Sequence, residues 1–156
     1  MVYKLEIDGW RSGITFSACH MMPELDKCSR LHGHTYAVHA RIYSETIRKG
    51  MVIDFTVIKK ILRKIIDKLD HKVLLPKARV KIENKKVKIT EDKKEYSFPI
   101  EDVILLDLEP VSAENLANYL LERLIDELDL KDRKFCKLEL GLDEGWGQGV
   151  WLIKKL

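Results

Sequence analysis

A chain of 156 residues, 46% hydrophobic and 34% charged, is long enough to bury the core of one globular domain without disulfides. Its formal net charge of +3 is too small to argue for a nucleic-acid partner, and it has no apolar run of the roughly 18 residues that a membrane helix needs. Residues 1–10 lack the apolar core of a secretory signal, and the cysteine count is odd, so we expect reduced thiols and a soluble, cytoplasmic protein.

Two segments near the N-terminus alternate between apolar and polar residues, which is typical of β-strands. One parity is shared by Ile14, Phe16, Ala18 and His20 in the first segment, and by His32, His34, Tyr36, Val38 and Ala40 in the second. Residues 21–31 between them follow no period and contain Pro23, which predicts a loop. This loop should return the chain to the end of the first strand.

Two amphipathic helices are predicted further along the chain. The apolar residues of 55–69 follow helical spacing, and Asp54 stands at the N-cap position before them. Ser112 caps the second helix, whose apolar positions run to Leu128. We expect both helices to pack against the same face of the sheet.

The segment 77–100 is rich in Lys and Glu and alternates on both sides of an Asn84-Lys85-Lys86 turn, which predicts an exposed β-hairpin insertion. Its lysines could contact phosphate or nucleic acid, but interleaved acidic residues favour a solvated face. Further strands are predicted at 103–106, 136–142 and 150–153, the last after a Gly-rich turn. The sum is an α+β fold in one domain, 1–156, with a largely antiparallel sheet and two helices on one face.

Three histidines form a candidate metal site. His32 and His34 are two apart on a strand, so their side chains share a face and lie roughly 6 to 7 Å apart at the backbone. His20 ends the inward row of the other strand and could supply a third imidazole. Three imidazoles suit Zn²⁺ and leave a coordination position open, although His-x-His alone also occurs in cupins and in barrel hydrolases.

Other residues near this site admit two interpretations. His39 lies on the opposite parity from His34, which favours a hydrogen-bonded strand residue, and Cys19 could compete as a thiolate ligand but points away from His20, which favours a small buried residue. Cys28 precedes the histidine pair by four residues, and a nearby metal and Arg30 would favour a reactive thiolate. The alternative for Cys28 is an inert loop cysteine.

The chain resembles the family of 6-pyruvoyl tetrahydropterin synthases and 6-carboxytetrahydropterin synthases, the T-fold synthases. The resemblance covers nearly the whole chain and rests on motifs in family order: FSACH at 16–20, CSRLHGH at 28–34, MVIDF at 51–55, LDH at 69–71, SAENLA at 112–117, and Glu144 followed by Gly149. It implies that His20, His32 and His34 bind zinc. It also implies an oligomer in which sheets close into a barrel, a trimer or a hexamer of two stacked trimers, with active sites between subunits.

The resemblance further implies catalytic roles for Cys28, as the base, and for Asp70 and His71, as the relay that accompanies it. An Asp can orient an imidazole, and the imidazole can take a proton or stabilise a thiolate. The alternative for Asp70 and His71 is a histidine at a helix C-terminus with a polar neighbour.

Glu144 matches the family's pterin anchor and continues the inward row of Leu138, Leu140 and Leu142, whereas its rival Glu139 lies on the opposite parity. Ser112 and Ala113 match a segment whose backbone also approaches the pterin, with Ser where Thr is usual; an ordinary N-cap is compatible with this role.

The three residues between Cys28 and His32 resemble the 6-carboxytetrahydropterin synthase branch of queuosine and archaeosine precursor biosynthesis. That branch converts 7,8-dihydroneopterin triphosphate with loss of acetaldehyde and triphosphate. The alternatives are 6-pyruvoyl tetrahydropterin formation, another dihydropterin side-chain cleavage, or a non-catalytic zinc or pterin-binding module. Two departures from the family, the 77–100 insertion and Gly145 where Thr is common, leave the side-chain and phosphate contacts open.

Overall fold

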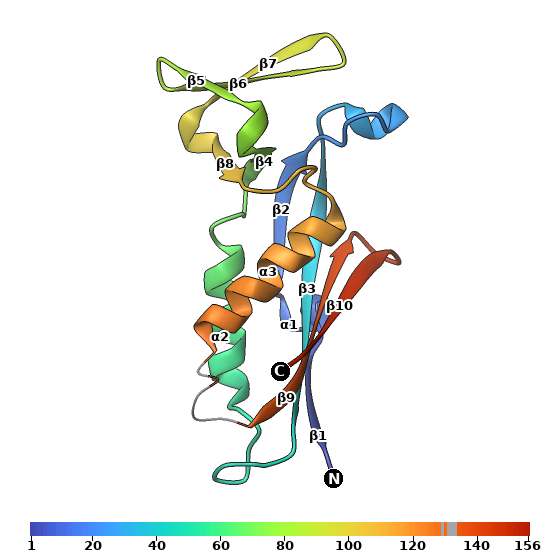
Figure 1. Cartoon of the computed structure of the whole chain (residues 1–156), viewed down its shortest axis with the longest axis vertical. Helices are drawn as coiled ribbons and strands as arrows, with labels where there is room; N and C mark the ends of the chain where they lie inside the picture. Colours follow the sequence, from blue (N-terminus) through green and yellow to red (C-terminus); the bar gives the residue numbers. More distant parts are fainter. Residues whose placement is uncertain (129, 131–133) are drawn as a thin grey trace.

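The computed structural model describes the chain except for residues 129 and 131–133 (Figure 1). Its α-helices are α1 (Gly9–Ser12), α2 (Phe55–Ile66) and α3 (Ala113–Glu127), and short 3-10 turns occur at η1 (Asp26–Ser29), η2 (Lys77–Arg79) and η3 (Ile100–Asp102). Its strands are β1 (Tyr3–Ile7), β2 (Thr15–His20), β3 (His32–Ser44), β4 (Lys72–Pro76), β5 (Lys81–Glu83), β6 (Lys86–Glu91), β7 (Lys94–Pro99), β8 (Val103–Leu106), β9 (Phe135–Glu144) and β10 (Gly149–Lys155).

The large sheet has the order β10-β9-β3-β2-β4-β8, and β3 is its central strand. The first half of β3 pairs with β2 and the second half pairs with β1, both antiparallel. Strand β4 runs parallel to β2 and to β8, so the sheet is mixed at that edge and antiparallel elsewhere. The predicted α+β class and the largely antiparallel sheet are confirmed, while α1, β1 and β4 were not predicted.

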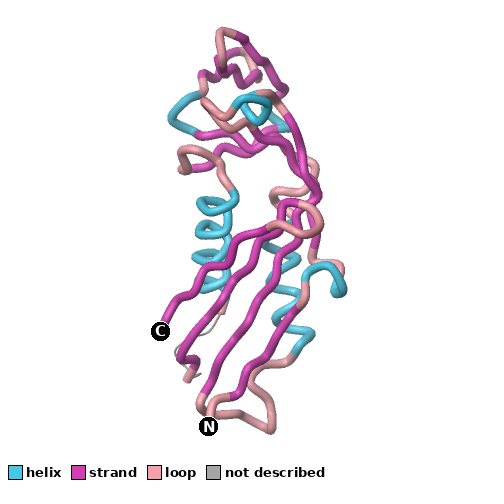
Figure 2. Tube along the Cα trace, turned by 90° about the vertical axis from the view of Figure 1, so that its right-hand side faces the viewer, coloured by secondary structure: helices cyan, strands magenta, loops and turns pink. Residues whose placement is uncertain are grey.

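Helices α2 and α3 lie side by side against one face of this sheet, as predicted (Figures 1 and 2). The Asp54 side chain accepts a hydrogen bond from the Thr56 N–H and begins α2, and Ser112 does the same for α3 through the Asn115 N–H. The apolar stripe of α2 includes Ile58 and Leu62, both at most 1% exposed, and burying such side chains contributes about 1.5–3 kcal/mol each. No helix in the described part of the chain is long and apolar enough to cross a membrane.

Between β4 and β8 the chain forms a separate sheet of β5, β6 and β7, visible at one end of the molecule in Figure 1. The sequence predicted a two-stranded hairpin here, and the structure adds a third strand. The turn falls at Asn84 and Lys85, which both have positive φ. The inner face of β6 packs on Met21, the residue that follows His20, and the insertion therefore covers the end of β2.

Arg79 pairs with one carboxylate inside the insertion and with a second one outside it. The carboxylate of Glu91, 6% exposed on β6, lies 2.8 Å from the Arg79 guanidinium, which also lies 3.5 Å from Glu109 on the segment that leads into α3. A buried carboxylate without such a partner would be strongly destabilising. Arg79 is therefore the residue that allows Glu91 to be buried at the end of β6.

Candidate metal centre and active site

Strand register brings the three predicted metal ligands together. His20 lies directly opposite His32, and Ala18 lies opposite His34, so all three imidazoles point to the face of the sheet that the helices cover. Their candidate ligand atoms all lie within 4.8 Å of one another, and the ring centroids are 4.6 to 5.2 Å apart. The grouping expected from the alternation is therefore present in the folded chain.

The hydrogen bonds of His20, the last residue of β2, and His32, the first residue of β3, fit a metal centre. The Nδ1 of His20 lies 2.8 Å from the Val111 carbonyl and that of His32 lies 2.8 Å from the Arg30 carbonyl. Because a carbonyl can only accept, both Nδ1 atoms carry a proton, and in the neutral ring the lone pair then lies on Nε2. In histidines that bind a metal, a hydrogen bond from the other ring nitrogen to a carbonyl fixes the orientation of the ring and its tautomer.

His20 gives the clearest support for a role as a metal ligand. The side chain is 2% exposed, and its Nε2 has no hydrogen-bond partner among the described residues. Burial lowers the pKa of His20, so the imidazole is neutral and its lone pair is available. Three such imidazoles are a donor set that fits Zn²⁺.

Glu144 joins this cluster from β9. It lies directly opposite Tyr36 in the β3–β9 register and therefore shares the face of the histidines; its Oε1 is 3.8 Å from the His20 Nε2. The Tyr36 hydroxyl donates a hydrogen bond to the same Oε1 at 3.3 Å. Burial, followed by the neighbouring Glu144 carboxylate, raises the pKa of Tyr36, so the hydroxyl remains a donor.

Glu139, the rival carboxylate, faces the other side of the sheet. Its oxygens lie 2.9 Å from Lys137 and 3.3 Å from Arg41. Although burial acts to raise the pKa of Glu139, the hydrogen bonds from Lys137 and Arg41 lower it below its usual range. A paired carboxylate on that face is structural.

Asp70 and His71 form a hydrogen-bonded pair beside Ser17 of β2. The Asp70 Oδ1 accepts the Ser17 N–H at 2.8 Å, and its Oδ2 lies 2.9 Å from the His71 Nδ1. The hydrogen bond from the Ser17 N–H lowers the pKa of Asp70. Since the His71 side chain is 82% exposed, its Nε2 edge is open to another molecule.

His71 borders a cleft of about 670 Å³. Four residues of its lining, Ser17, Cys19, Gly33 and Thr35, have the strand parity opposite to that of the metal ligands, so the cleft opens mainly on the face of the sheet away from the helices. The cleft is lined by Ser17, Ala18, Cys19, Gly33, His34, Thr35, His71, Lys72, Val73 and Asp102. His34 lines the cleft together with His71, so the cleft also adjoins the histidine cluster.

Cys28 lies in η1 on the loop that links β2 to β3, with an exposed side chain and a free thiol. The backbone of Cys28 bonds to Met22 and Leu25, both at 2.8 Å, and these bonds fold the loop back on itself. The loop leaves from His20 and returns at His32, so the thiol is carried at the ligand end of both strands.

Ser112 and Ala113 begin α3 beside the metal ligands. The Ser112 side chain accepts a hydrogen bond from the Asn115 N–H, which confirms the predicted N-cap, and Ala113 is the first helical residue. The preceding residue, Val111, supplies the carbonyl that holds His20.

Two of these contacts were not predicted. Tyr36 shares the parity of His34, so its inward orientation was visible in the sequence, but its bond to Glu144 joins residues 108 positions apart. The Val111 carbonyl is a backbone atom and has no sequence signature.

The structure decides between the interpretations that the sequence left open for His39 and Cys19. His39 accepts the Gly9 N–H at Nδ1 and lies 3.2 Å from Asp143 at Nε2, which confirms a hydrogen-bonded strand residue. Cys19 does point away from His20, but it is half-buried and lines the cleft, so the prediction of a buried residue was wrong. The cause is Gly33, which stands opposite Cys19 and has no side chain to cover it.

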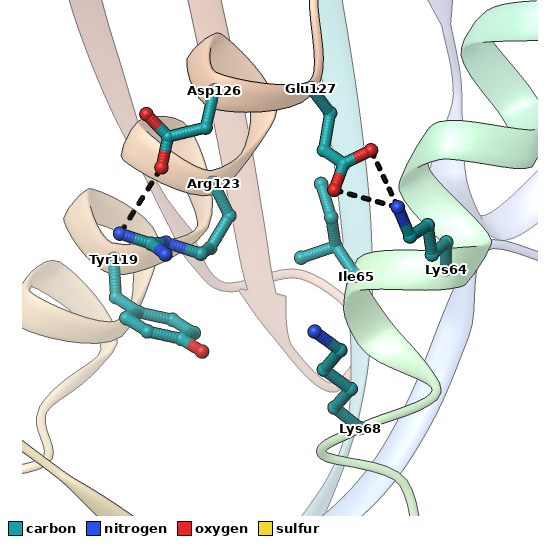
Figure 3. Close-up of a pocket in the computed structure, with 7 residues that line it drawn as sticks. All are labelled: Lys64, Ile65, Lys68, Tyr119, Arg123, Asp126 and Glu127. Carbon is teal, nitrogen blue, oxygen red and sulfur yellow. Dashed lines mark hydrogen bonds and ion pairs between the residues drawn. The ribbon is translucent and has the colours of Figure 1, made fainter.

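A second hollow, between α2 and α3, has a volume of about 80 Å³ (Figure 3). Figure 3 shows two ion pairs among its charged side chains: Lys64 lies 2.8 Å from Glu127, and Arg123 lies 3.2 Å from Asp126. Exposed pairs of this kind contribute little and are common on helix surfaces, so we assign no site here.

A mixed sheet with two helices on one face and converging imidazoles at the end of its central strands defines the class of T-fold enzymes. The chain belongs to the 6-pyruvoyl tetrahydropterin synthase family, whose model matches residues 11–146. It is therefore a lyase of the tetrahydropterin synthase type.

Relatives support this membership over the full length. A Methanocaldococcus jannaschii protein described as a 6-carboxy-5,6,7,8-tetrahydropterin synthase is 38% identical, over 97% of each chain. One of the same description from Pyrococcus horikoshii is 36% identical over 71% of this chain and 69% of its own. The structure of Plasmodium vivax 6-pyruvoyltetrahydropterin synthase matches with a TM-score of 0.91 at 28% identity, over 100% of this chain and 99% of that one.

Proposed function

We propose that the chain is a cytoplasmic, zinc-dependent 6-carboxy-5,6,7,8-tetrahydropterin synthase. It would convert 7,8-dihydroneopterin triphosphate, with loss of acetaldehyde and triphosphate, in the biosynthesis of the queuosine and archaeosine precursor. The observation that carries the proposal is the three-histidine cluster with Glu144 beside it and Cys28 on the loop between its ligands. The description of the Methanocaldococcus jannaschii relative supports the choice of reaction.

His20, His32 and His34 would hold the zinc ion, each through a neutral imidazole nitrogen. When bound, zinc supplies a Lewis acid that polarises side-chain oxygens of the substrate. The protein's own part begins with Val111 and Arg30, whose carbonyls keep the Nδ1 protons of His20 and His32 in place and direct Nε2 inward.

Glu144 would anchor the pterin. Its carboxylate is partly buried, and the donors of an amino-pyrimidine edge would provide the partners that a buried charge requires. The backbone at Ser112 and Ala113 begins α3 next to the Val111 carbonyl and would approach the same ring. These contacts orient the substrate side chain toward the histidines.

Cys28 would move the proton at the substrate side chain, and Asp70 would orient His71 as its partner. Since the His71 side chain is 82% exposed and open to another molecule, we propose that the pair serves the site of a neighbouring subunit. The assembly would be a trimer that closes a β-barrel, or two such trimers stacked as a hexamer. In the described part of the chain β10 is an edge strand, with Trp151 39% and Ile153 66% exposed, and closure would cover this edge.

The test is an end-product assay on the zinc-loaded protein. Incubation with 7,8-dihydroneopterin triphosphate should release acetaldehyde together with a 6-carboxy pterin, detected by derivatisation and mass spectrometry. A 6-pyruvoyl product would favour the alternative reaction of the same family. No turnover beside a working control enzyme would refute the lyase assignment to this substrate and favour a non-catalytic binding module.

A further inference from the structure

Glu144 lies beside one of the three metal ligands. Its Oε1 is 3.8 Å from the His20 Nε2, whereas two ligand atoms on one tetrahedral zinc, each at about 2.1 Å, are roughly 3.4 Å apart. The carboxylate would therefore have to move toward the three imidazoles to bind the same ion. Carboxylates are ordinary zinc ligands, and a fourth protein ligand would close the site.

The Tyr36 hydroxyl holds the same oxygen. It donates to the Glu144 Oε1 at 3.3 Å, from a residue that is 0% exposed and directly opposite Glu144 in the strand register. The Tyr36 ring stacks on Phe16 with centroids 4.9 Å apart and planes 13° from parallel. Register and packing therefore fix the donor, and Glu144 is the group that must move if the contact is to break.

We propose that Tyr36 is a positioning residue that keeps Glu144 off the metal. A carboxylate that turned to the metal would leave a buried hydroxyl without an acceptor, and this cost disfavours the closed site. The carboxylate then remains available to the pterin, and the metal keeps an open position for the substrate oxygens. The inference rests on the zinc and Glu144 assignments of the proposed function.

Tyr36→Phe tests this inference, because it keeps the ring and its stack on Phe16 and removes only the donor. Zinc affinity should rise about tenfold, measured by chelator competition, since the cost of one charge-assisted hydrogen bond no longer opposes ligation. The visible absorption of the Co²⁺-substituted protein should change as a carboxylate enters the ligand shell. Binding of neopterin, an unreactive pterin, should weaken about tenfold because Glu144 is diverted.

A role limited to packing predicts a different outcome, namely weaker zinc and weaker neopterin binding together. Adding Glu144→Gln to Tyr36→Phe should remove the gain in zinc affinity, because an amide is a poor zinc ligand. Tyr43→Phe, on the same strand and facing Lys137 on the other side of the sheet, is the matched control and should leave zinc and neopterin binding unchanged.

Unchanged or weaker zinc binding by Tyr36→Phe, with an unchanged Co²⁺ spectrum, would overturn the role of Tyr36 and leave the proposed function standing. A wild-type protein that binds no zinc would overturn both.

Discussion

Zinc should raise the thermal stability of this protein substantially. The ligand atoms of His20, His32 and His34 converge within 4.8 Å in the folded chain, whereas the unfolded chain holds them apart. Free zinc at a hundred times its dissociation constant then stabilises the native state by about 2.7 kcal/mol. At roughly 2–4 °C per kcal/mol for a domain of this size, the melting temperature should rise by about 5–11 °C.

Differential scanning calorimetry of the chelator-treated protein, with and without added zinc, measures this shift. His32→Ala should lose stoichiometric zinc and nearly all of the shift, whereas His39→Gln, which alters a histidine outside the cluster, should keep it. A wild-type melting temperature that does not respond to zinc, or an equal response in His32→Ala, would refute the ligand assignment.

Three further predictions concern residues around the cluster. Cys28→Ala should retain stoichiometric zinc by metal analysis and lose acetaldehyde release; sustained turnover would contradict its proton-transfer role. Gly33→Ala should weaken zinc binding several-fold in chelator competition, because a Cβ would meet the Ala18 oxygen at 3.0 Å between two ligands; an unchanged affinity would show that the strands adjust freely. Asp70 has a pKa lowered by the Ser17 N–H, so its contribution to stability is present above its unfolded pKa of about 3.9 and lost as pH falls through the lower folded value. Urea unfolding should therefore show the gap between wild type and Asp70→Ala shrinking below about pH 4, and a constant gap would argue against the shift.

The helices and most central strands were predictable because their local periods are strong. The Asp54 and Ser112 caps precede clear apolar stripes, and β2, β3 and β9 alternate over long runs. Strand β1 escaped prediction since only Leu5 and Ile7 are buried in its five residues. Strand β7 was missed as a separate strand, because its buried face is carried by partly exposed aromatic residues among Lys and Glu.

At the site, local alternation placed the three histidines and Glu144 on one face, but it did not bring β9 beside β3. That pairing joins Tyr36 to Glu144 across 108 positions, and no short-range pattern encodes such a register. The exposure of His71 was also beyond reach, because this residue follows a helix and belongs to no strand whose parity could be read.

The small sheet of β5, β6 and β7 leaves the fold after Pro76 and returns at Val103, on strands that pair directly with each other. Because β4 and β8 are held by their own parallel pairing, with Val73 opposite Val103 and Pro76 opposite Leu106, residues can be gained or lost between them without shifting the pairing of β2 with β3. The residues of the small sheet that share a hydrophobic cluster with Met21 can therefore change while the pairing of His20 with His32 stays constant. For protein engineers, this segment is a place to graft new sequence without altering the strands that carry the histidines.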